Sequence, residues 1–356
     1  LVGMRGGEKV LEALCELYPD ADIFTHVCDP DAISETLRSH RITSTFIQCL
    51  PRARAWYQRY LPLMPLALEQ LDLRGYDLVI SSESGPAKGI VPPPESTHIC
   101  YCHSPMRYVW DMYHDYLADA GRLTKLMMPP LLHYMRTWDV TTAPRVDHFI
   151  ANSSYVAARI RKYYRRDAKV IHPPVDTMEF SPRADGGDFY LMMGQLTGYK
   201  RADLAVEAFN ETGKPLVIIG EGEMRRELEK KAGANIRFMG WQPFESIKEH
   251  YARCRALIFP GTEDFGIVPV EAMASGRPVI AYRRGGATET VVDGVSGLFF
   301  DQQTVPALID AVRRFEAVDG GYASEPIIRH AKKFDREVFK QSMKDFIDRV
   351  VEHPPG

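Results

Sequence analysis

The chain has 356 residues, which at ~100–200 residues per domain predicts two domains and excludes a single small binding module. Hydrophobic residues make up 45% and charged residues 26%, a mix typical of folded globular proteins that excludes disorder, collagen-like repeats and coiled coil. Lys plus Arg (44) against Asp plus Glu (47) gives a net charge of −3, so no global positive field is available to hold nucleic acid.

The cysteines and the apolar runs bear on location. Six cysteines are too few and too scattered for a disulfide framework in a chain of this length, which favours a reducing cytoplasm. No apolar run reaches the ~18–20 residues of a membrane span, and no leader opens the sequence. Leu1 begins directly in a Gly-rich loop that runs into a helical pattern, so we expect a first strand to be missing upstream.

Short β-branched and apolar runs alternate with amphipathic helical stretches along the whole chain, which predicts an α/β protein with parallel sheets. The strands predicted in the first half are Ile23–Val27, Leu78–Ser81, His98–Cys102 and His148–Ala151. Those predicted in the second half are Phe189–Met193, Pro215–Ile219, Ile236–Met239, Ala256–Phe259, Pro278–Ala281 and Gly297–Phe300. Two such sets predict two Rossmann-like domains, which bind a ligand in a cleft between the carboxyl ends of their strands.

A stretch rich in Pro, Gly and Asp separates the two sets and cannot continue a helix or a central strand. It predicts an N-terminal domain at residues 1–172, a linker at 173–187 and a C-terminal domain at 188–332. Residues 333–356 follow, with an amphipathic helix predicted at Asp335–Val350.

The strongest chemical signal is the segment Glu263–Glu271, which follows the predicted strand Ala256–Phe259. If a helix begins near Ile267, its free backbone N–H groups form a site for a diphosphate. The carboxylates of Glu263 and Glu271 flank that site and could bind sugar hydroxyls. The alternative is that Glu271 only favours the helix dipole and that Glu263 is a solvated loop residue.

This segment resembles the signature of the retaining nucleotide-sugar glycosyltransferases of family 4 (glycosyltransferases group 1), which have the GT-B fold. The motifs that match in the second half are Gly194–Arg201, Gly220–Gly222, Arg237–Trp241, Glu263–Ala281, Gly285–Glu289 and Gly294–Leu298. In the first half, Gly6–Leu11, Tyr101–Tyr108 and Trp110-Asp111 are similar to the branch that contains O-antigen and capsule mannosyltransferases.

The resemblance implies roles for individual residues. Lys200 would neutralise the departing diphosphate, Glu263 would bind the transferred sugar, and Glu271 would bind the ribose. His103 would lie near the reacting carbon, so that His103, Lys200 and Glu263 form the catalytic set. The remaining donor-binding residues would be Gly6, Gly7, Arg201, Phe238, Gly240, Trp241, Phe265, Gly266, Ile267 and Val268. The terminal helix would cross back to the N-terminal domain.

The implied reaction is metal-independent transfer of a hexose with retention, without a cofactor, in surface polysaccharide (lipopolysaccharide) synthesis. GDP-mannose is the first expectation for the donor and a UDP-sugar is the alternative; the acceptor would be a hydroxyl of a lipid-linked molecule or an oligosaccharide. Gln195 stands where many family members have Arg, so Lys200 or Arg201 must meet more of the leaving-group charge.

Three further features have two readings each. Asp20-Ala21-Asp22 and Asp29-Pro30-Asp31 are interpreted as turn and cap residues, and Cys100 with Cys102 as core, because neither pattern completes a metal site. The segment Arg52–Leu66 combines cations with aromatic and aliphatic residues, which predicts either peripheral contact with the inner face of an anionic membrane or ordinary helix packing.

Two other classes of protein share the two-domain pattern. A nucleotide-cofactor oxidoreductase is disfavoured because Gly220-Glu221-Gly222 lacks the third glycine of a Gly-x-Gly-x-x-Gly turn. A non-catalytic sugar-binding protein stays open, and a donor-hydrolysis assay would distinguish it from the enzyme.

Overall fold

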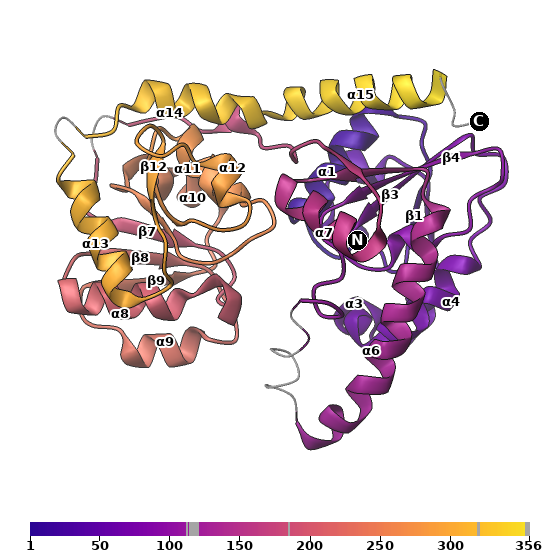
Figure 1. Cartoon of the computed structure of the whole chain (residues 1–356), viewed down its shortest axis with the longest axis horizontal. Coiled ribbons are helices and arrows are strands. Elements are labelled where there is room, and N and C mark those ends of the chain that lie inside the picture. Colours follow the sequence, from indigo (N-terminus) through magenta and orange to yellow (C-terminus); the bar gives the residue numbers. More distant parts are fainter. Residues whose placement is uncertain (112, 114–120, 184–185, 319–320, 353–356) are drawn as a thin grey trace. The chain divides into compact units, whose positions relative to one another are not determined.

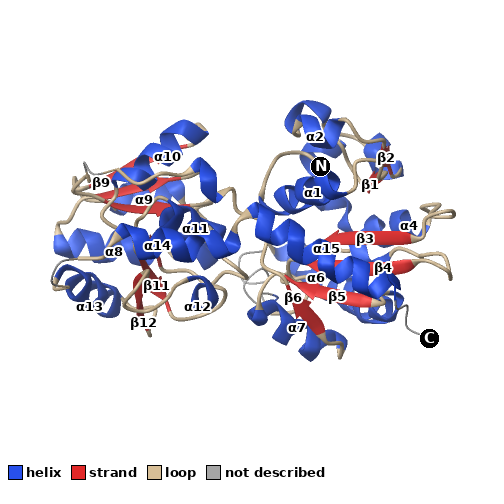
Figure 2. Cartoon of the chain, turned by 90° about the horizontal axis from the view of Figure 1, so that it is seen from above, coloured by secondary structure: helices blue, strands red, loops and turns tan. Residues whose placement is uncertain are grey.

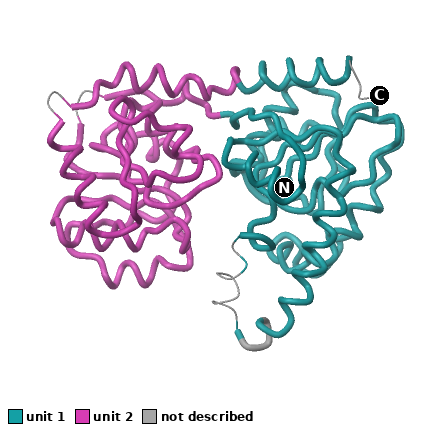
Figure 3. The backbone as a smooth tube through the Cα atoms, in the orientation of Figure 1, with its two compact units in different colours: residues 1–174, 339–356 teal, residues 175–338 magenta. Residues whose placement is uncertain are grey.

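The computed structural model describes residues 1–111, 113, 121–183, 186–318 and 321–352. The chain forms two compact units, which Figure 3 distinguishes by colour: unit 1 comprises residues 1–174 and 339–356, and unit 2 comprises residues 175–338. Each unit is built on parallel strands, which confirms the predicted α/β class. Residues 184–185 of the predicted linker and 353–356 of the C-terminal segment lie outside the described residues.

Unit 1 contains a two-stranded sheet, β1-β2, and a four-stranded sheet in the order β3-β4-β5-β6, both parallel. Its strands are β1 (Ile23–Thr25), β2 (Ile42–Ser44), β3 (Leu78–Glu83), β4 (Thr97–Cys102), β5 (His148–Ala151) and β6 (Ala168–Val170). Its helices are α1 (Gly6–Leu17), α2 (Glu35–Arg38), α3 (Ala53–Trp56), α4 (Met64–Glu69), α6 (Arg122–Thr142), α7 (Ser154–Tyr164) and most of α15 (Arg336–Glu352).

The alternation of side chains along β4 explains how helices cover both faces of the larger sheet in unit 1 (Figure 2). Ile99 and Tyr101 pack on one face with residues of α1 and α15, including Phe339. Cys100 and Cys102 point to the other face and pack with α7. Both strand faces are therefore buried, as parallel sheets require.

Unit 2 contains one six-stranded parallel sheet in the order β12-β11-β10-β7-β8-β9. Its strands are β7 (Tyr190–Met193), β8 (Leu216–Ile219), β9 (Ile236–Gly240), β10 (Leu257–Phe259), β11 (Val279–Tyr282) and β12 (Gly297–Phe300). Its helices are α8 (Ala202–Thr212), α9 (Arg225–Lys231), α10 (Phe244–Arg253), α11 (Ile267–Ala274), α12 (Ala287–Thr290), α13 (Val305–Glu316) and α14 (Ser324–Ala331).

Helices lie on both faces of the sheet of unit 2 (Figure 1), and an apolar cluster packs each face of the sheet against them. One cluster joins Leu191 and Leu257 to residues of α10, α11 and α14, and the other joins Tyr190 and Ile258 to residues of α8 and α13. The sheet is doubly wound, because the chain passes from β7 outward to β9 and then returns to the other side of β7 as β10. Ligands of such sheets bind beyond the carboxyl ends of the strands at this switch point.

The predicted strands are all present, with ends that shift by one or two residues. The largest differences are two residues: β1 ends at Thr25 and not at Val27, and β3 continues to Glu83 and does not end at Ser81. The sequence analysis missed β2 and β6. Each is only three residues long, too short to show an alternating pattern.

Candidate active site

The ammonium group of Lys200 is paired with the carboxylate of Glu263 at the switch point of unit 2. Lys200 ends the single turn Gly198–Lys200 that follows β7, and Glu263 lies in the loop that follows the neighbouring strand β10. Their side chains are only 14% and 17% exposed. The fold thus holds a cation and a carboxylate together at the place where doubly wound sheets bind ligands.

Gly261 lets these two loops approach each other. A Cβ atom at this position would lie 2.8 Å from both the Lys200 Cα atom and the Tyr199 carbonyl oxygen. These contacts are too short, so a larger residue would force the backbone of the Lys200 loop to move. The glycine of the turn after β10 therefore allows Lys200 to reach Glu263.

Helix α11 begins at Ile267, as predicted, four residues after Glu263. Gly266 precedes it with φ of 91°, a left-handed conformation that glycine adopts without strain. The N–H groups of Ile267 and Val268 are in the first turn, where a helix provides no carbonyl partner for them, and Pro269 contributes no N–H. Phe265, just before this turn, is buried in the core. The positive end of the helix dipole therefore follows Glu263 closely in sequence and lies at the same sheet edge as the Lys200–Glu263 pair.

Glu271, in the middle of α11, is held by a residue that the sequence analysis did not identify. The hydroxyl of Tyr251 in α10 donates a hydrogen bond of 2.8 Å to Glu271 Oε2. Tyr251 is fully buried, and burial together with the nearby carboxylate raises its pKa well above the ordinary value. The phenol is therefore neutral at physiological pH and acts as a fixed donor that orients Glu271.

The predicted donor-binding residues Phe238, Gly240 and Trp241 lie at the carboxyl end of β9. Phe238 packs partly against the core, and Gly240 ends the strand with φ of 67°. The Trp241 side chain is 74% exposed, while its N–H donates to Glu221 Oε1 at 3.3 Å. An exposed indole held by its backbone at the carboxyl edge of a sheet offers a stacking surface for a planar ring.

Gln195 occupies the position where many family members have Arg, and the nearby cation Arg201 is already bonded within the protein. The Arg201 side chain, next to Lys200, bonds to both Asp203 oxygens at 3.1–3.2 Å. The Gln195 side chain is exposed. In the structure Arg201 is thus held by its own helix, and Lys200 is the cation that meets Glu263.

In unit 1, His103 follows β4 and lies close to the start of α1. The backbone N–H of His103 donates to the Glu83 carbonyl at 2.7 Å, and the ring atom Nε2 is 2.9 Å from Ser82 Oγ. A Cβ atom at Gly7 would be 3.8 Å from His103 Nε2, and Gly6 is the first residue of α1. Burial lowers the pKa of His103 to about 4, so the imidazole is neutral at physiological pH.

The structure therefore groups the predicted residues in two sets, one in each unit. His103, Gly6 and Gly7 come together in unit 1. Lys200, Glu263, Glu271 and the start of α11 gather in unit 2, with Phe238–Trp241 at the carboxyl end of another strand of the same sheet.

The cysteine and Asp-x-Asp motifs have local surroundings in unit 1. Cys100 and Cys102 are buried in the core and reduced, as predicted. Asp22 accepts from the Tyr76 hydroxyl. Asp29 lies at the N-cap position of the single turn Pro30–Ala32, as predicted, but its side chain does not cap that turn and pairs with Arg54 at 3.0 Å. Within the described residues, no group of three or more His, Cys, Asp or Glu side chains is arranged to hold a metal ion. A metal-free reaction stays a prediction.

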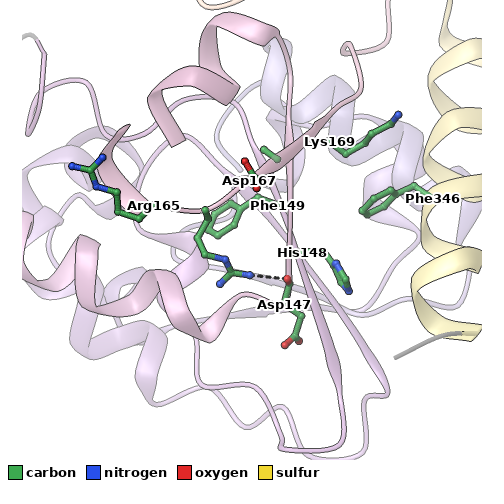
Figure 4. A pocket seen from close by; sticks show the side chains of 9 residues that line it. Asp147, His148, Phe149, Arg165, Asp167, Lys169 and Phe346 are labelled. Carbon is green, nitrogen blue, oxygen red and sulfur yellow. Dashed lines mark hydrogen bonds between the residues drawn. The ribbon is translucent and has the colours of Figure 1, made fainter. Parts of the chain in front are cut away.

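A hollow of about 570 Å³ lies elsewhere, at the amino ends of β5 and β6 (Figure 4). His148, Phe149 and Phe346 line it, and Arg166 donates to the Asp147 carbonyl beside it at 2.8 Å. None of the predicted site residues contributes to it. Because ligands of these folds bind at the carboxyl ends of the strands, we assign the site to the residues above and not to this hollow.

Tyr251 and Ser82, the direct partners of Glu271 and His103, could not be recognised from the sequence. Tyr251 is one of several aromatic residues on helices with an apolar face, and Ser82 is an ordinary strand residue. Only the three-dimensional contacts distinguish them.

Two sequence families cover nearly the whole chain. Residues 4–179 match the family described as Glycosyltransferase Family 4, and residues 176–333 match the one described as Glycosyl transferases group 1. The solved structure of sucrose-phosphate synthase from Thermosynechococcus elongatus is similar over 96% of this chain and 92% of its own, with a TM-score of 0.74 and 20% identity. That of Anabaena HepE in complex with UDP and glucose covers 97% and 96%, with a TM-score of 0.70 and 17% identity. The chain consists of glycosyltransferase domains with the GT-B fold.

Among curated proteins, the chain is 28% identical over 221 residues to O-antigen chain mannosyltransferase C of Escherichia coli, which is 56% of this chain and 57% of that protein. It is 30% identical over 192 residues to a GDP-mannose-dependent α-(1-6)-phosphatidylinositol monomannoside mannosyltransferase of Mycolicibacterium smegmatis, 45% and 50% of the two chains. The chain thus spans about half the length of these relatives.

Proposed function

We propose that this protein transfers a hexose from a nucleotide sugar to an acceptor hydroxyl with retention at the anomeric carbon. The observation that carries the proposal is the Lys200–Glu263 pair at the switch point of unit 2, beside the start of α11. A cation and a helix N-terminus suit a diphosphate, and a carboxylate next to them suits the hydroxyls of the sugar that the diphosphate carries.

Lys200 has the central electrostatic role in this proposal. In the structure Glu263 balances its charge. When the donor binds, the diphosphate oxygens take over this ammonium group, and Glu263 turns to the hydroxyls of the sugar. As the bond between C1 and the phosphate oxygen breaks, negative charge grows on the diphosphate, where Lys200 and the N–H groups of Ile267 and Val268 stabilise it.

The acceptor oxygen attacks C1 from the face that the diphosphate leaves. The new bond joins C1 to the acceptor oxygen, and the acceptor proton passes to the departing phosphate oxygen. Neutral His103, oriented by Ser82, contributes a hydrogen bond near the sugar and no charge. Glu271, fixed by Tyr251, binds the two ribose hydroxyls.

Mannose from GDP-mannose is the proposed donor. Its support is the pair of mannosyltransferases among the relatives, one of which is named as GDP-mannose-dependent. A UDP-sugar is the second candidate, since the HepE structure contains UDP and glucose. The exposed Trp241 ring can stack on either base.

The proposed acceptor is a lipid-linked or oligosaccharide hydroxyl in surface polysaccharide synthesis, reached at the inner face of a membrane. No helix in the described part of the chain is long and apolar enough to cross a bilayer. In unit 1, Leu66 is 53% exposed, and Leu126 and Met127 of α6 are 73% and 62% exposed. These apolar side chains favour shallow contact with a membrane surface.

The cations of Arg52–Leu66 are partly engaged within the protein. Arg52 and Arg59 each stack over the Trp56 ring, at 4.8 and 4.7 Å, while Arg54 pairs with Asp29. Flotation with neutral and anionic vesicles tests the membrane proposal. Recovery that depends on anionic lipid and falls in the double variant Arg52→Glu/Arg59→Glu supports it, whereas equal recovery with both lipids returns this segment to helix packing.

A thermal-shift panel of GDP, UDP and ADP sugars tests the donor. A ligand at about 100 times its dissociation constant adds ~2.7 kcal/mol of stability, so the true donor stands out from the others. Turnover of that donor then separates the enzyme from a protein that only binds sugars. Absence of any shift with all three nucleotides would contradict the proposal.

A further inference from the structure

Three charged residues are fully buried in unit 1 next to His103. Glu83 ends β3, Lys88 lies in the single turn Ala87–Gly89 that follows, and Asp139 is in α6; all three side chains are 0% exposed. Lys88 Nζ pairs with Asp139 and lies 3.4 Å from Glu83 Oε1. The Lys88 N–H also donates to Glu83 Oε2 at 2.6 Å.

The fold does not need such a group for its core. Taking three charges out of water is costly, and an apolar replacement of similar size is often as stable or more so. The cluster is therefore expected to fix a geometry that apolar packing would leave loose. The residues that it contacts show which geometry that is.

The first connection runs from Glu83 to His103. Glu83 pairs in register with Cys102, and its carbonyl accepts the His103 N–H at 2.7 Å. Because Lys88 holds the Glu83 carboxylate through both its backbone and its side chain, the end of β3 that carries Ser82 and Glu83 cannot shift independently. Ser82 is the partner of the His103 ring.

The second connection runs from Asp139 to the loop after β4. Asp139 Oδ2 accepts the Trp110 indole N–H at 2.7 Å. The Tyr164 hydroxyl also donates to Asp139, at 3.1–3.2 Å. Trp110 stacks on Tyr163 with ring centroids 4.5 Å apart. Trp110 is thus anchored at the far end of residues 104–111, the loop that begins directly after His103.

Two arginines also hold the loop 104–111, one at its start and one near its end. Arg159 of α7 donates to Ser104 Oγ at 2.8 Å and to the Pro105 carbonyl at 3.1 Å. Arg136 of α6 donates to the Val109 carbonyl at 2.8 Å. Asp139 is three residues further along α6, so the Lys88 cluster fixes the same helix that holds the loop.

We propose that Glu83, Lys88 and Asp139 form a positioning cluster that fixes His103 and the loop 104–111 relative to each other. The cluster acts through the Glu83 carbonyl and the Trp110 indole and does not itself touch a substrate. Its catalytic consequence rests on the proposed function, whereas its effect on the loop does not.

Hydrogen exchange measured by mass spectrometry on the whole chain tests this inference in two variants. Trp110→Phe removes the indole N–H and keeps a ring to stack on Tyr163, and Asp139→Asn removes the charge that faces Lys88. Trp138→Phe is the matched control, since it removes an indole N–H that bonds to Glu69 at 3.3 Å and keeps an aromatic ring at the position where Trp138 lies 6.0 Å from Lys88 Nζ. If Asp139→Asn does not fold, Trp110→Phe decides alone.

We expect exchange of residues 103–111 to accelerate roughly ten- to a hundredfold in the two variants, as for loss of a hydrogen bond to a charged group, and to stay unchanged in the control. The affinity for free GDP or UDP should stay within about twofold of wild type, while kcat for transfer should fall at least about tenfold. This split between binding and turnover is what a purely structural defect would not produce.

Unchanged exchange in both variants, or equal acceleration in the control, overturns the proposal. Faster exchange with an unchanged kcat overturns it as well, because the loop would then not need to be fixed. If the wild-type protein transfers no sugar from any nucleotide, the proposed function fails, and the exchange comparison still decides whether the cluster fixes the loop.

Discussion

The hydroxyl of Tyr251 in α10 donates a 2.8 Å hydrogen bond to Glu271 Oε2 in α11, and the whole tyrosine side chain is buried. Glu271, the residue predicted to bind the ribose, is therefore oriented by a side chain in the core of unit 2. A neutral donor of this kind fixes one carboxylate oxygen of Glu271 without adding a charge to the site.

Tyr251→Phe keeps the ring and removes only this hydrogen bond. We expect the affinity for free nucleotide to fall about three- to tenfold, because Tyr251 only orients Glu271 and the loss should stay near the ~0.5–1.5 kcal/mol of a typical hydrogen bond. Tyr190→Phe is the matched control, because Tyr190 is also buried and donates at 2.9 Å to a carboxylate, that of Glu316. Calorimetry decides: equal affinities for the two variants would show that Tyr251 does not orient Glu271 for binding.

Glu271→Ala and Glu263→Ala are expected to have different effects. Loss of a hydrogen bond to a charged group costs ~1.5–3 kcal/mol, or roughly ten- to a hundredfold. Glu271→Ala should weaken free nucleotide by this factor, whereas Glu263→Ala should leave nucleotide binding nearly intact and lower transfer. Calorimetry combined with steady-state kinetics separates the two, and wild-type behaviour of both variants would refute the assignment of this segment.

Lys200→Met tests the leaving-group role. Transfer should fall at least about a hundredfold, because the cation acts where charge develops. Thermal stability should fall as well, because the substitution leaves the Glu263 carboxylate without its cation in a pair that is only 14% and 17% exposed. Lys214→Met removes a comparable cation, which pairs with Glu316 at 2.8 Å, and should keep full activity. Equal losses in both variants would point to a general effect of charge.

Acid should destabilise the protein through its neutral histidines. Burial lowers the pKa of His26, His98 and His103 to about 4, from an ordinary 6.5. Between these values the unfolded chain binds protons and the folded one does not, so the free energy of unfolding falls as pH drops from about 6.5 to 4. Fully buried His98 alone contributes ~2 kcal/mol of this loss at pH 5.

Glu83 changes the stability in the opposite direction with pH, because burial raises its pKa to about 7. Between pH 4.5 and pH 7 the folded protein holds a proton on Glu83 that the unfolded chain has lost, so the stability contributed by this group falls as pH rises.

Urea unfolding of wild type and His98→Gln from pH 7 to pH 5 isolates the histidine contribution. The variant should show a shallower pH dependence, and parallel curves would exclude His98 as a contributor.

Chelation should leave transfer unchanged, since protein cations and not a metal are proposed to meet the diphosphate. The check is initial rate in buffer with excess chelator, compared with added magnesium or manganese. Activity lost in chelator and regained with either ion would overturn this prediction.

The sequence predicted the sheet of unit 2 well because its strands are buried on both faces and form continuous apolar runs, as at Leu216–Ile219. The start of α11 was equally readable, since Gly266 and Pro269 mark it. The short strands β2 and β6 were missed because three residues carry too little pattern.

The contacts of the site were much less predictable. Nothing in the spacing of Lys200 and Glu263, 63 residues apart, shows that they pair; the return of the chain beside β7 brings them together. Lys88 looks like a solvated surface lysine in sequence, yet it is fully buried between two carboxylates. Such long-range pairs depend on topology, which residue type and periodicity do not specify.

The most direct test of the account is proton NMR of the reaction of the wild-type protein with GDP-mannose, and then with UDP-sugars, in the presence of a lipid-linked or oligosaccharide acceptor. The account predicts loss of the donor's anomeric signal without added metal and a product whose newly formed linkage has the anomeric configuration of the donor. A product of inverted configuration, or neither binding nor turnover of any nucleotide sugar, would contradict it.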